Sequence, residues 1–586
     1  MTSFIKNWTL GDLAQTGGSA CPIGDIVQHL VSSGFDPEPA KEIQAMFQSS
    51  AQRLLSNAEA ANPTTPCRAF WVPGRIEVLG KHTDYAGGKS LLGAVNKGFA
   101  VVSTTTQDAV QNNVRIFTQF SDGRELNETL RLIGTPEDLE RLRKCTTDEG
   151  GWAAYPAAAV QRLTSNFGIT VGADIAIECS LPEASGMSSS SAVICYMWMV
   201  LDSYNDISSG INGKATNAAA FAKSIAVNTD MSPGTEGEAN LYTFLGNIEN
   251  GKDFRPGQGE FTLNGMGGVG TFGGSEDHTA IMSCTKGQLK MWEYCPTKHL
   301  RTVNVDPNVR FVVAVSGAKA EKTGAAMNEY NDACALAAWS AACFTVSRAS
   351  STEKPMDRDT LGALFPNTTL YNPNVPNCAE VVRQVRAELN NLHSNYFGDC
   401  CGTKRSSDDS SSEQVRSTII AAMRSVTSHF KTSLPAVMGP LGLGCDGLES
   451  DRITMDVLVQ RFEQYFDESE DIVSSCCEHF DSKNYEALGT MVDSSHLFTV
   501  EKLKNTIPET AWLPRWARTA EGKALAASAF GAGFGGSCWA LVNKDESEDF
   551  CKRWLNAYEK QFPAKEGCGL TREFFVFAPG PGAFAL

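Results

Sequence analysis

The chain has 586 residues, of which 42% are hydrophobic and 20% are charged, and its formal net charge is -17. This length exceeds what one hydrophobic core supports, so we expect two or three domains. The excess of acidic residues argues against nucleic acid as a main partner, because phosphate backbones bind clustered Lys and Arg. An anionic nucleotide is not excluded, since backbone amides and Mg²⁺ can hold phosphate groups whatever the net charge.

No segment of the sequence is typical of export or of membrane insertion. The first residues lack the apolar core of a signal peptide, and no apolar run reaches the roughly 18 residues that a membrane span needs. The 18 cysteines are scattered without zinc-ligand spacing, which favours free thiols. We therefore expect a cytoplasmic protein with no membrane partner, and we leave its state, monomer or dimer, open.

The first half of the chain mixes predicted helices and strands. Residues 1–66 form a helical N-terminal extension, in which 23–30 and 39–58 have apolar residues at helical spacing. The stretch 61–66, with two prolines, marks its end. Beyond it, short apolar stretches predict strands at 68–72, 100–104, 114–117 and 173–179. Longer apolar stretches predict helices at 152–163 and 188–203, and this mixture favours an α+β fold.

A second region begins near residue 305. The apolar run 309–315 predicts a buried strand, and 323–349 has a helical pattern. Residues 350–440 differ in composition from their surroundings. Because the stretch 403–413 within them consists almost entirely of charged residues and serines, we interpret about 350–440 as an insertion.

The first of three motifs runs from residue 73 to residue 88. A predicted strand leads into a turn that contains Arg75, His82, Asp84 and Tyr85 beside several glycines. So many hydrogen-bonding side chains suit a polyhydroxyl ligand, since each hydroxyl group needs both donors and acceptors. A polar surface turn is the simpler alternative.

The second motif, residues 181–192, runs straight into the predicted helix 188–203. Gly186 allows the backbone to approach an anion, and four consecutive serines bring hydroxyl and amide groups to the start of the helix. The helix dipole favours phosphate at this place. An ordinary serine N-cap is the alternative.

The third motif, residues 530–542, contains glycines at the spacing of a dinucleotide-binding fingerprint: Gly531, Gly533 and Gly536. That fingerprint needs a strand before the glycines and a helix after them. Here a helix-like stretch, 524–529, comes first and a predicted strand follows, so we reject a dinucleotide site. The small residues instead indicate close backbone packing near the ligand, or a simple turn.

In series, the three motifs resemble the signature segments of GHMP kinases, and the first is similar to that of galactokinases. The main departure in the first motif is Lys81, where galactokinases have Glu. Further similar segments surround Trp152, Glu249, Asp277 and Tyr330, and another lies at 488–496. The resemblance covers about 67–345 and 480–586 and leaves out the N-terminal extension and the insertion.

The resemblance implies an α+β, two-lobed GHMP kinase fold with the active site between the lobes. The N-terminal lobe, 67–304, would be ribosomal protein S5 domain 2-like and bind ATP, and the C-terminal lobe, 305–586, would be ferredoxin-like. The implied activity is transfer of the γ-phosphate of ATP, with Mg²⁺, to the anomeric hydroxyl of a monosaccharide, galactose first. Alternatives are a kinase for a uronic acid, arabinose or N-acetylgalactosamine, a mevalonate-type kinase, or a catalytically inactive regulator that binds sugar and ATP.

The resemblance also implies roles for individual residues. Asp277 would accept or orient the proton of the sugar hydroxyl, and Arg75 would keep it ionised; a polar-loop acid and a structural ion pair are the simpler alternatives. The other implied sites are for sugar (Lys81, His82, Asp84, Tyr330), for ATP (Trp152, Gly186, Ser188, Ser189, Ser190) and for Mg²⁺ (Ser190, Glu249). Alignment on the alanine that follows the serines selects Ser191 for the metal instead of Ser190.

Lys81 leaves the nature of the sugar open. An ammonium group only donates hydrogen bonds and has the opposite charge to the Glu of galactokinases. It could serve as the counter-ion of a uronic acid or accompany another neutral sugar. Alternatively, Lys81 turns outward or pairs with Glu77 and leaves a galactose-like site.

Overall fold

The structure is a computed structural model that describes residues 8–337 and 455–586, apart from short gaps, of which 16–25, 138–150 and 227–235 are the largest. The predicted insertion at about 350–440, with its stretch 403–413, and most of the helix predicted at 323–349 lie outside the described residues. Within the described part, the cysteines are free thiols. None of the helices described has the length and apolar character needed to cross a membrane.

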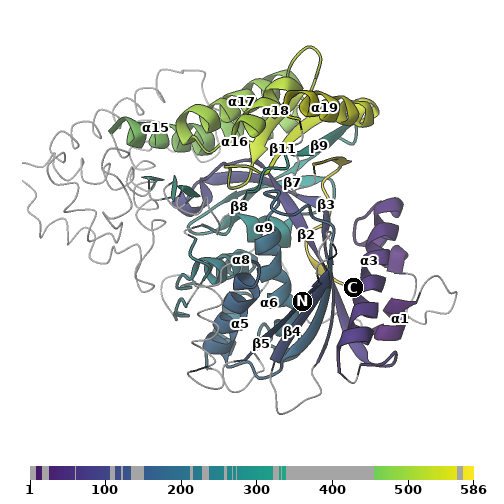
Figure 1. Cartoon of the computed structure of the whole chain (residues 1–586). Helices are drawn as coiled ribbons and strands as arrows, with labels where there is room; N and C mark the ends of the chain where they lie inside the picture. The colour runs from purple at the N-terminus through teal and green to yellow at the C-terminus, as the bar shows by residue number, and fades with distance from the viewer. Residues whose placement is uncertain are drawn as a thin grey trace, which may run out of the picture.

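A nine-stranded sheet is the centre of the N-terminal part of the molecule (Figure 1). Its strands are β1 (Trp8–Thr9), β2 (Pro66–Leu79), β3 (Lys89–Thr105), β4 (Asn113–Gln119), β5 (Glu125–Arg131), β6 (Ala173–Cys179), β7 (Gln288–Glu293), β8 (Lys298–Asn304) and β13 (Phe584–Ala585). The main order is β1-β2-β3-β6-β4-β5; β13 pairs with β2, and β7 pairs with β3 and β8. Every pairing is antiparallel except that of β4 with β6.

Helices cover both faces of this sheet (Figure 1). One face packs against the extension, which forms α1 (Leu10–Ala14), α2 (Ile26–Ser32) and α3 (Pro37–Asn57). On the other side, one hydrophobic core joins the sheet to α5 (Ala154–Phe167), α6 (Ser189–Asn205), α7 (Thr216–Ser224), α8 (Glu236–Asn250) and α9 (Glu276–Ser283). Side chains alternate along β2. Ala69 and Trp71 therefore face the core shared with the extension, and Phe70 and Val72 face the core shared with α5 to α9.

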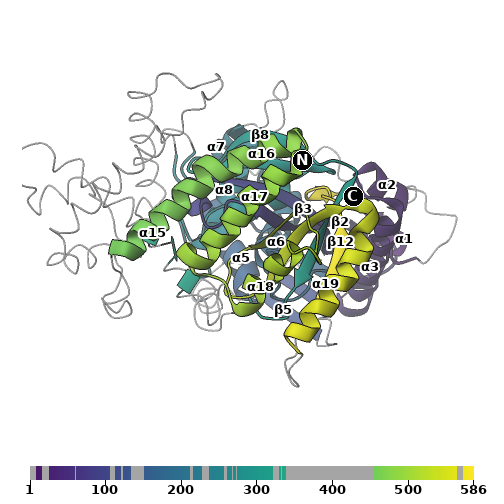
Figure 2. The ribbon, with the colours of Figure 1, turned by 90° about the horizontal axis from the view of Figure 1, so that it is seen from above.

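A four-stranded antiparallel sheet and a group of helices form the C-terminal part. Its order is β10-β11-β9-β12, with bounds β9 (Val309–Val315), β10 (Ala526–Phe530), β11 (Ser537–Asn543) and β12 (Glu573–Phe577). The helices are α15 (Met455–Phe466), α16 (Val473–Asp481), α17 (Tyr485–Phe498), α18 (Pro508–Ala517) and α19 (Ser547–Gln561). Figure 2 shows α15, α17 and α19 lying across the top of the molecule. The α+β, two-lobed expectation is confirmed.

The helix predicted at 524–529 is wrong, because this segment forms β10. Its alanines favour a helix in isolation, but Ala526 to Phe530 pair residue for residue with Leu541 to Ser537 of β11. Tertiary pairing therefore overrides local propensity. The third motif is a turn between two antiparallel strands, and the rejection of a dinucleotide site stands.

Strand β2 extends well beyond the predicted 68–72 and continues through the first motif to Leu79. Its pairing with β3 shifts register between Pro73 and Arg75 and again between Glu77 and Leu79. Two residues apart on one strand, Arg75 and Glu77 share a face. Strand geometry therefore brings both charged side chains to the same cavity.

The extension packs as a full layer on the sheet, since Phe47 of α3 is fully buried in the core that it shares with Trp71 and Val102. We expect Phe47→Ala to destabilise this layer by about 3–5 kcal/mol, because it removes a buried ring and leaves a cavity. Thermal unfolding of the purified variant measures the loss. Glu42→Ala, at an exposed position of the same helix, is the control, and equal midpoints for the two variants would contradict the packing.

Candidate active site

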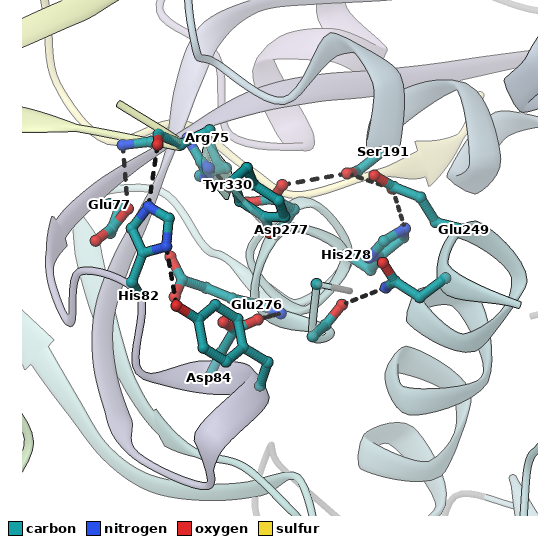
Figure 3. A pocket seen from close by; sticks show the side chains of 16 residues that line it. Arg75, Glu77, His82, Asp84, Ser191, Glu249, Glu276, Asp277, His278 and Tyr330 are labelled. Atoms are coloured by element: carbon teal, nitrogen blue, oxygen red, sulfur yellow. Dashed lines mark hydrogen bonds and ion pairs between the residues drawn. The ribbon is translucent and has the colours of Figure 1, made fainter. Parts of the chain in front are cut away.

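A cavity lined mostly by buried side chains lies where the first motif, the second motif and α9 meet (Figure 3). Its walls come from β2 and the turn after it, the start of α6, the end of α8, the start of α9, and the glycine turn between β10 and β11. The lining residues are Arg75, Glu77, His82, Asp84, Tyr85, Ser191, Glu249, Asn250, Gly273, Gly274, Glu276, Asp277, His278, Tyr330, Gly531 and Ala532. Six residues predicted for the site are among them: Arg75, His82, Asp84, Glu249, Asp277 and Tyr330.

Arg75 and Asp277 form an ion pair in the wall of the cavity. Arg75 Nε donates to Asp277 Oδ1 at 2.8 Å, and Arg75 Nη1 donates to the carbonyl of Gly186 at 2.7 Å. Burial alone lowers the pKa of Arg75, but the negative charges of Asp277, Glu276 and Glu77 outweigh it and raise the pKa. Asp277 also lies in the first turn of α9, where the helix dipole favours a negative charge. The arrangement keeps Asp277 a carboxylate.

The second oxygen of Asp277 faces a cluster of oxygen atoms. Ser191 Oγ lies 3.2 Å from Asp277 Oδ2 and 2.7 Å from Glu249 Oε2, and His278 Nε2 lies 3.1 Å from the same Glu249 oxygen. Ser191 therefore lies beside Glu249 in the cavity, and the assignment of either serine to a metal stays a prediction. Because α6 begins at Ser189 and a helix turns by about 100° per residue, neighbouring serines face different directions, and Ser190 is outside the cavity lining.

The start of α6 has features of an anion-binding turn. Gly186 and Ser188 both have left-handed backbones, with φ of 77° and 58°. Ser188 Oγ is buried and has no hydrogen-bond partner in the part of the chain that the structure describes. The glycine turn after β10 closes on this loop: a Cβ on Gly531 would lie 2.8 Å from the carbonyl oxygen of Gly186. The second and third motifs thus meet, as expected for backbone packing beside a ligand.

All five residues predicted to bind ATP, including Gly186 and Ser188, lie outside the cavity lining. Ser189 and Ser190 are half-buried at the start of α6, and Trp152 is half-buried just before α5, where it packs against the large core. Their assignment to ATP stays a prediction.

The turn after β2 presents acceptors and an aromatic ring to the cavity. His82 Nε2 lies 3.0 Å from the carbonyl of Ala532, so this nitrogen has the proton, and a neutral His82 accepts from Tyr85 Oη at Nδ1, 3.0 Å away. Asp84 Oδ2 accepts from the backbone N–H of Glu276 at 3.1 Å. The ring of Tyr330 lies 5.4 Å from that of His82. These groups suit hydroxyl ligands.

Lys81 lies in the same turn but is absent from the cavity lining. Its Nζ donates to Ser495 Oγ at 2.8 Å and lies 4.0 Å from Glu468 Oε1, and the residue is 1% exposed. The side chain therefore turns neither outward nor toward a ligand. Its direct ionic partner is Glu468 rather than Glu77, and the structure gives no support to Lys81 as the counter-ion of a uronic acid.

The C-terminal lobe holds the turn in place through residues that the sequence did not single out. Glu468, in the π-helical segment Asp467–Ile472, accepts from the backbone N–H of Gly80 at 2.8 Å. Arg461 Nη2 of α15 donates to the carbonyl of His82 at 2.6 Å. These contacts join positions almost 400 residues apart, and no local pattern indicates them.

Two further acids, Glu77 and Glu276, line the cavity and were also missed as site residues. Glu77 Oε2 accepts from the backbone N–H of Gly531 at 3.1 Å. Burial raises the pKa of Glu77 to about 7, although Arg75 and Lys81 oppose this rise. Burial also raises the pKa of Glu276, and the charges of Glu77 and Asp84 add to it. The cavity therefore holds carboxyl groups that are poorly neutralised by the protein itself.

Three family models match separate parts of the chain. The galactokinase galactose-binding signature matches residues 60–104, the GHMP kinases N terminal domain matches 154–234, and the GHMP kinases C terminal model matches 473–560. The first contains Arg75, Glu77 and the turn with His82, and the second contains the serines of α6.

Known proteins similar to this chain include bacterial galactokinases. The galactokinase of Lactobacillus helveticus is 30% identical over 156 residues, which are 26% of this chain and 37% of that protein. The galactokinase of Staphylococcus carnosus is 31% identical over 144 residues, 24% of this chain and 34% of that protein. The matches thus span about a third of the length of these relatives. The crystal structure of Lactococcus lactis galactokinase complexed with galactose shares the fold, with a TM-score of 0.52, 18% identity, and coverage of 89% of this chain and 95% of that one.

The raised pKa of Glu77 predicts a pH-dependent stability of the ligand-free protein. Folded Glu77 binds a proton up to about pH 7, whereas its ordinary pKa is 4.5. The contribution of protonated Glu77 to the free energy of unfolding is therefore fully present below pH 4.5 and is lost as the pH rises through about 7. Glu77→Gln keeps an acceptor for Gly531, so its melting temperature should fall less than that of the wild type across this range.

Melting curves at several pH values between about 4.5 and 8 measure this difference. Glu521→Gln, at an exposed position, is the matched control and should follow the wild type. Parallel curves for the wild type and Glu77→Gln would contradict the prediction.

The pairing of Lys81 with Glu468 predicts a large effect of breaking it. Glu468→Leu leaves a buried ammonium group without its nearest anion and should destabilise the protein by about 3–5 kcal/mol. The double variant Lys81→Met/Glu468→Leu should recover part of this loss, since an apolar pair replaces the ionic one. Thermal unfolding of the single and double variants measures both effects. A double variant less stable than Glu468→Leu alone would contradict the pairing.

Proposed function

We propose that this chain, which belongs to the GHMP kinase superfamily and is galactokinase-like, is an ATP-dependent kinase that phosphorylates a monosaccharide. Galactose is the first candidate substrate and its anomeric hydroxyl the acceptor. The observation that carries this proposal is the buried Arg75–Asp277 pair, because it presents an ionised carboxylate between the oxygen cluster of Ser191 and Glu249 and the hydroxyl-binding turn of His82 and Asp84.

Asp277 is the proposed proton acceptor for the sugar hydroxyl. Its Oδ1 is held by Arg75 while its Oδ2 faces Ser191, so the carboxylate has a fixed orientation. A hydroxyl bound beside it would lose its proton to Asp277 as the phosphoryl group is transferred. Arg75 keeps a positive charge beside the reacting groups and offsets the negative charge that builds up there.

ATP and Mg²⁺ fit the opposite end of the cavity. The unpartnered hydroxyl of Ser188 and the left-handed turn at Gly186 suit a phosphate group at the start of α6. Ser191 and Glu249 supply hydroxyl and carboxylate oxygens, which suit Mg²⁺, an ion that takes few protein ligands beside phosphates and water. Among the described residues no cluster of three or more His, Cys, Asp and Glu could hold a metal by itself. Bound there, Mg²⁺ would neutralise charge on the phosphates.

The sugar would occupy the end formed by the turn after β2. Asp84 is an acceptor for hydroxyl donors, and Tyr330 offers a phenol whose pKa is raised by burial, so it stays a donor. His82 keeps its Nε2 proton on Ala532, which fixes the ring beside the ligand. The boundaries of the ATP-binding lobe, 67–304, and of the second lobe, 305–586, are part of the same proposal.

The kinase proposal predicts that Asp277→Asn folds but loses most of its turnover, by roughly 10²–10⁴-fold, because the amide cannot accept the proton. ADP release is measured with galactose, arabinose, N-acetylgalactosamine, galactosamine, galacturonate and glucuronate as acceptors. Asp545→Asn, at an exposed position, is the control and should keep wild-type turnover. Near-normal turnover in Asp277→Asn would contradict its role. Absence of sugar-dependent ADP release in the wild type would favour an inactive, ligand-binding regulator.

A further inference from the structure

The hydroxyl-binding end of the cavity is rich in carboxyl groups. Figure 3 shows Glu77, Asp84 and Glu276 around His82, on the side of the cavity away from Ser191 and Glu249. Arg75 is the one lysine or arginine in the described lining, and it is bound to Asp277 and to the carbonyl of Gly186. Carboxyl groups therefore outnumber cationic side chains in the described lining at this end.

Glu77 has an oxygen atom without a partner. Its Oε2 accepts from Gly531, but Oε1 is buried and forms no hydrogen bond with any described residue, and Glu77 is only 3% exposed. Neither Glu77 nor Glu276 forms an ion pair within the described part of the chain. Leaving a buried acceptor unpaired costs free energy. A ligand that donates a hydrogen bond to this oxygen would remove that cost.

The charge of the ligand decides how many of the carboxyl groups at this end gain a hydrogen-bond donor or an opposite charge. A hydroxyl group supplies one donor and no charge, whereas an ammonium group supplies three donors and a positive charge. A carboxylate on the ligand would add to the repulsion among Glu77, Asp84 and Glu276. Burial raises the pKa of Glu77 and Glu276. A cation bound beside them would lower both pKa values again, because a nearby positive charge favours the ionised carboxylate.

We propose that the sugar end of the cavity selects an amino sugar, a hexosamine whose ammonium group is held between the carboxylates of Glu77 and Glu276. This inference rests on the proposed function, because it names the class of sugar that the same site would take. It also agrees with the position of Lys81, whose ammonium group faces Glu468 and Ser495 and does not line the cavity.

Binding of matched sugar pairs to the full chain tests the proposal. Titration calorimetry, with Mg²⁺ and a non-hydrolysable ATP analogue present, compares galactosamine with galactose and glucosamine with glucose at neutral pH. We expect at least one hexosamine to bind roughly tenfold or more tightly than its parent hexose, since a charge-assisted hydrogen bond is stronger than a neutral one. N-acetylation of that hexosamine removes the charge and should abolish the gain, and galacturonate should bind more weakly than galactose.

Variants assign the preference to particular side chains. Glu276→Gln and Glu77→Gln each remove one negative charge at nearly constant volume, so each should reduce the ratio of hexosamine to hexose affinity. Glu521→Gln, at an exposed position outside the cavity lining, should retain the wild-type ratio. If one of the two cavity variants does not fold, the other variant and the hexosamine–hexose comparisons on the wild-type protein still test the proposal.

The outcomes separate this inference from the kinase proposal. Two hexosamines that bind no more tightly than their parent hexoses, or a preference unchanged in both cavity variants, would overturn the amino-sugar assignment. ADP release, measured separately, decides whether the chain is a kinase. Absence of turnover with a retained hexosamine preference would overturn the kinase proposal and leave the charge selection standing.

Discussion

The buried ion pair between Arg75 and Asp277 is the constraint on which the arrangement of the cavity depends. It joins β2 of the large sheet to the first turn of α9, and the same guanidinium also holds the carbonyl of Gly186 before α6. Removing two charges from water is expensive unless their geometry and remaining hydrogen bonds are well satisfied. Each neighbouring element must therefore keep its place. The extended course of β2, its register shifts and the close approach of Gly531 to Gly186 are consistent with this demand.

The parts of the site that could be predicted from sequence are those encoded by local pattern. Glycines beside polar residues mark a turn, and serines before an apolar stretch mark a helix start, so His82, Asp84 and Gly186 could be selected without a structure. Ser191 could not be separated from Ser190, because the facing of each serine depends on where α6 begins and on the position of Glu249. Likewise, the alanines of 526–530 gave a wrong helix, because the partner strand that determines their conformation follows only after the glycine turn.

Lys81 shows most clearly what local sequence lacks. A charge opposite to that of a related family draws attention to the ligand, yet the residue that accounts for it is Glu468, 387 positions away. Because of this long-range contact, the lysine binds the C-terminal lobe and stabilises the turn, and it does not line the cavity. Similarly, Glu276 is an unremarkable acid in its sequence context, and only the fold brings it beside Glu77 and Asp84.

The contact between the two ends of the described chain has a consequence for how the protein is made. Trp8 Nε1 donates to the carbonyl oxygen of Leu586, and β13 pairs with β2 across more than 500 positions. Leu586 is fully buried in the core between α3 and the sheet. During synthesis, this N-terminal layer is therefore incompletely covered until residues 584–586 have left the ribosome. Such a late, long-range closure slows folding and exposes apolar surface meanwhile, so synthesis of this chain would benefit from chaperones that shield nascent segments.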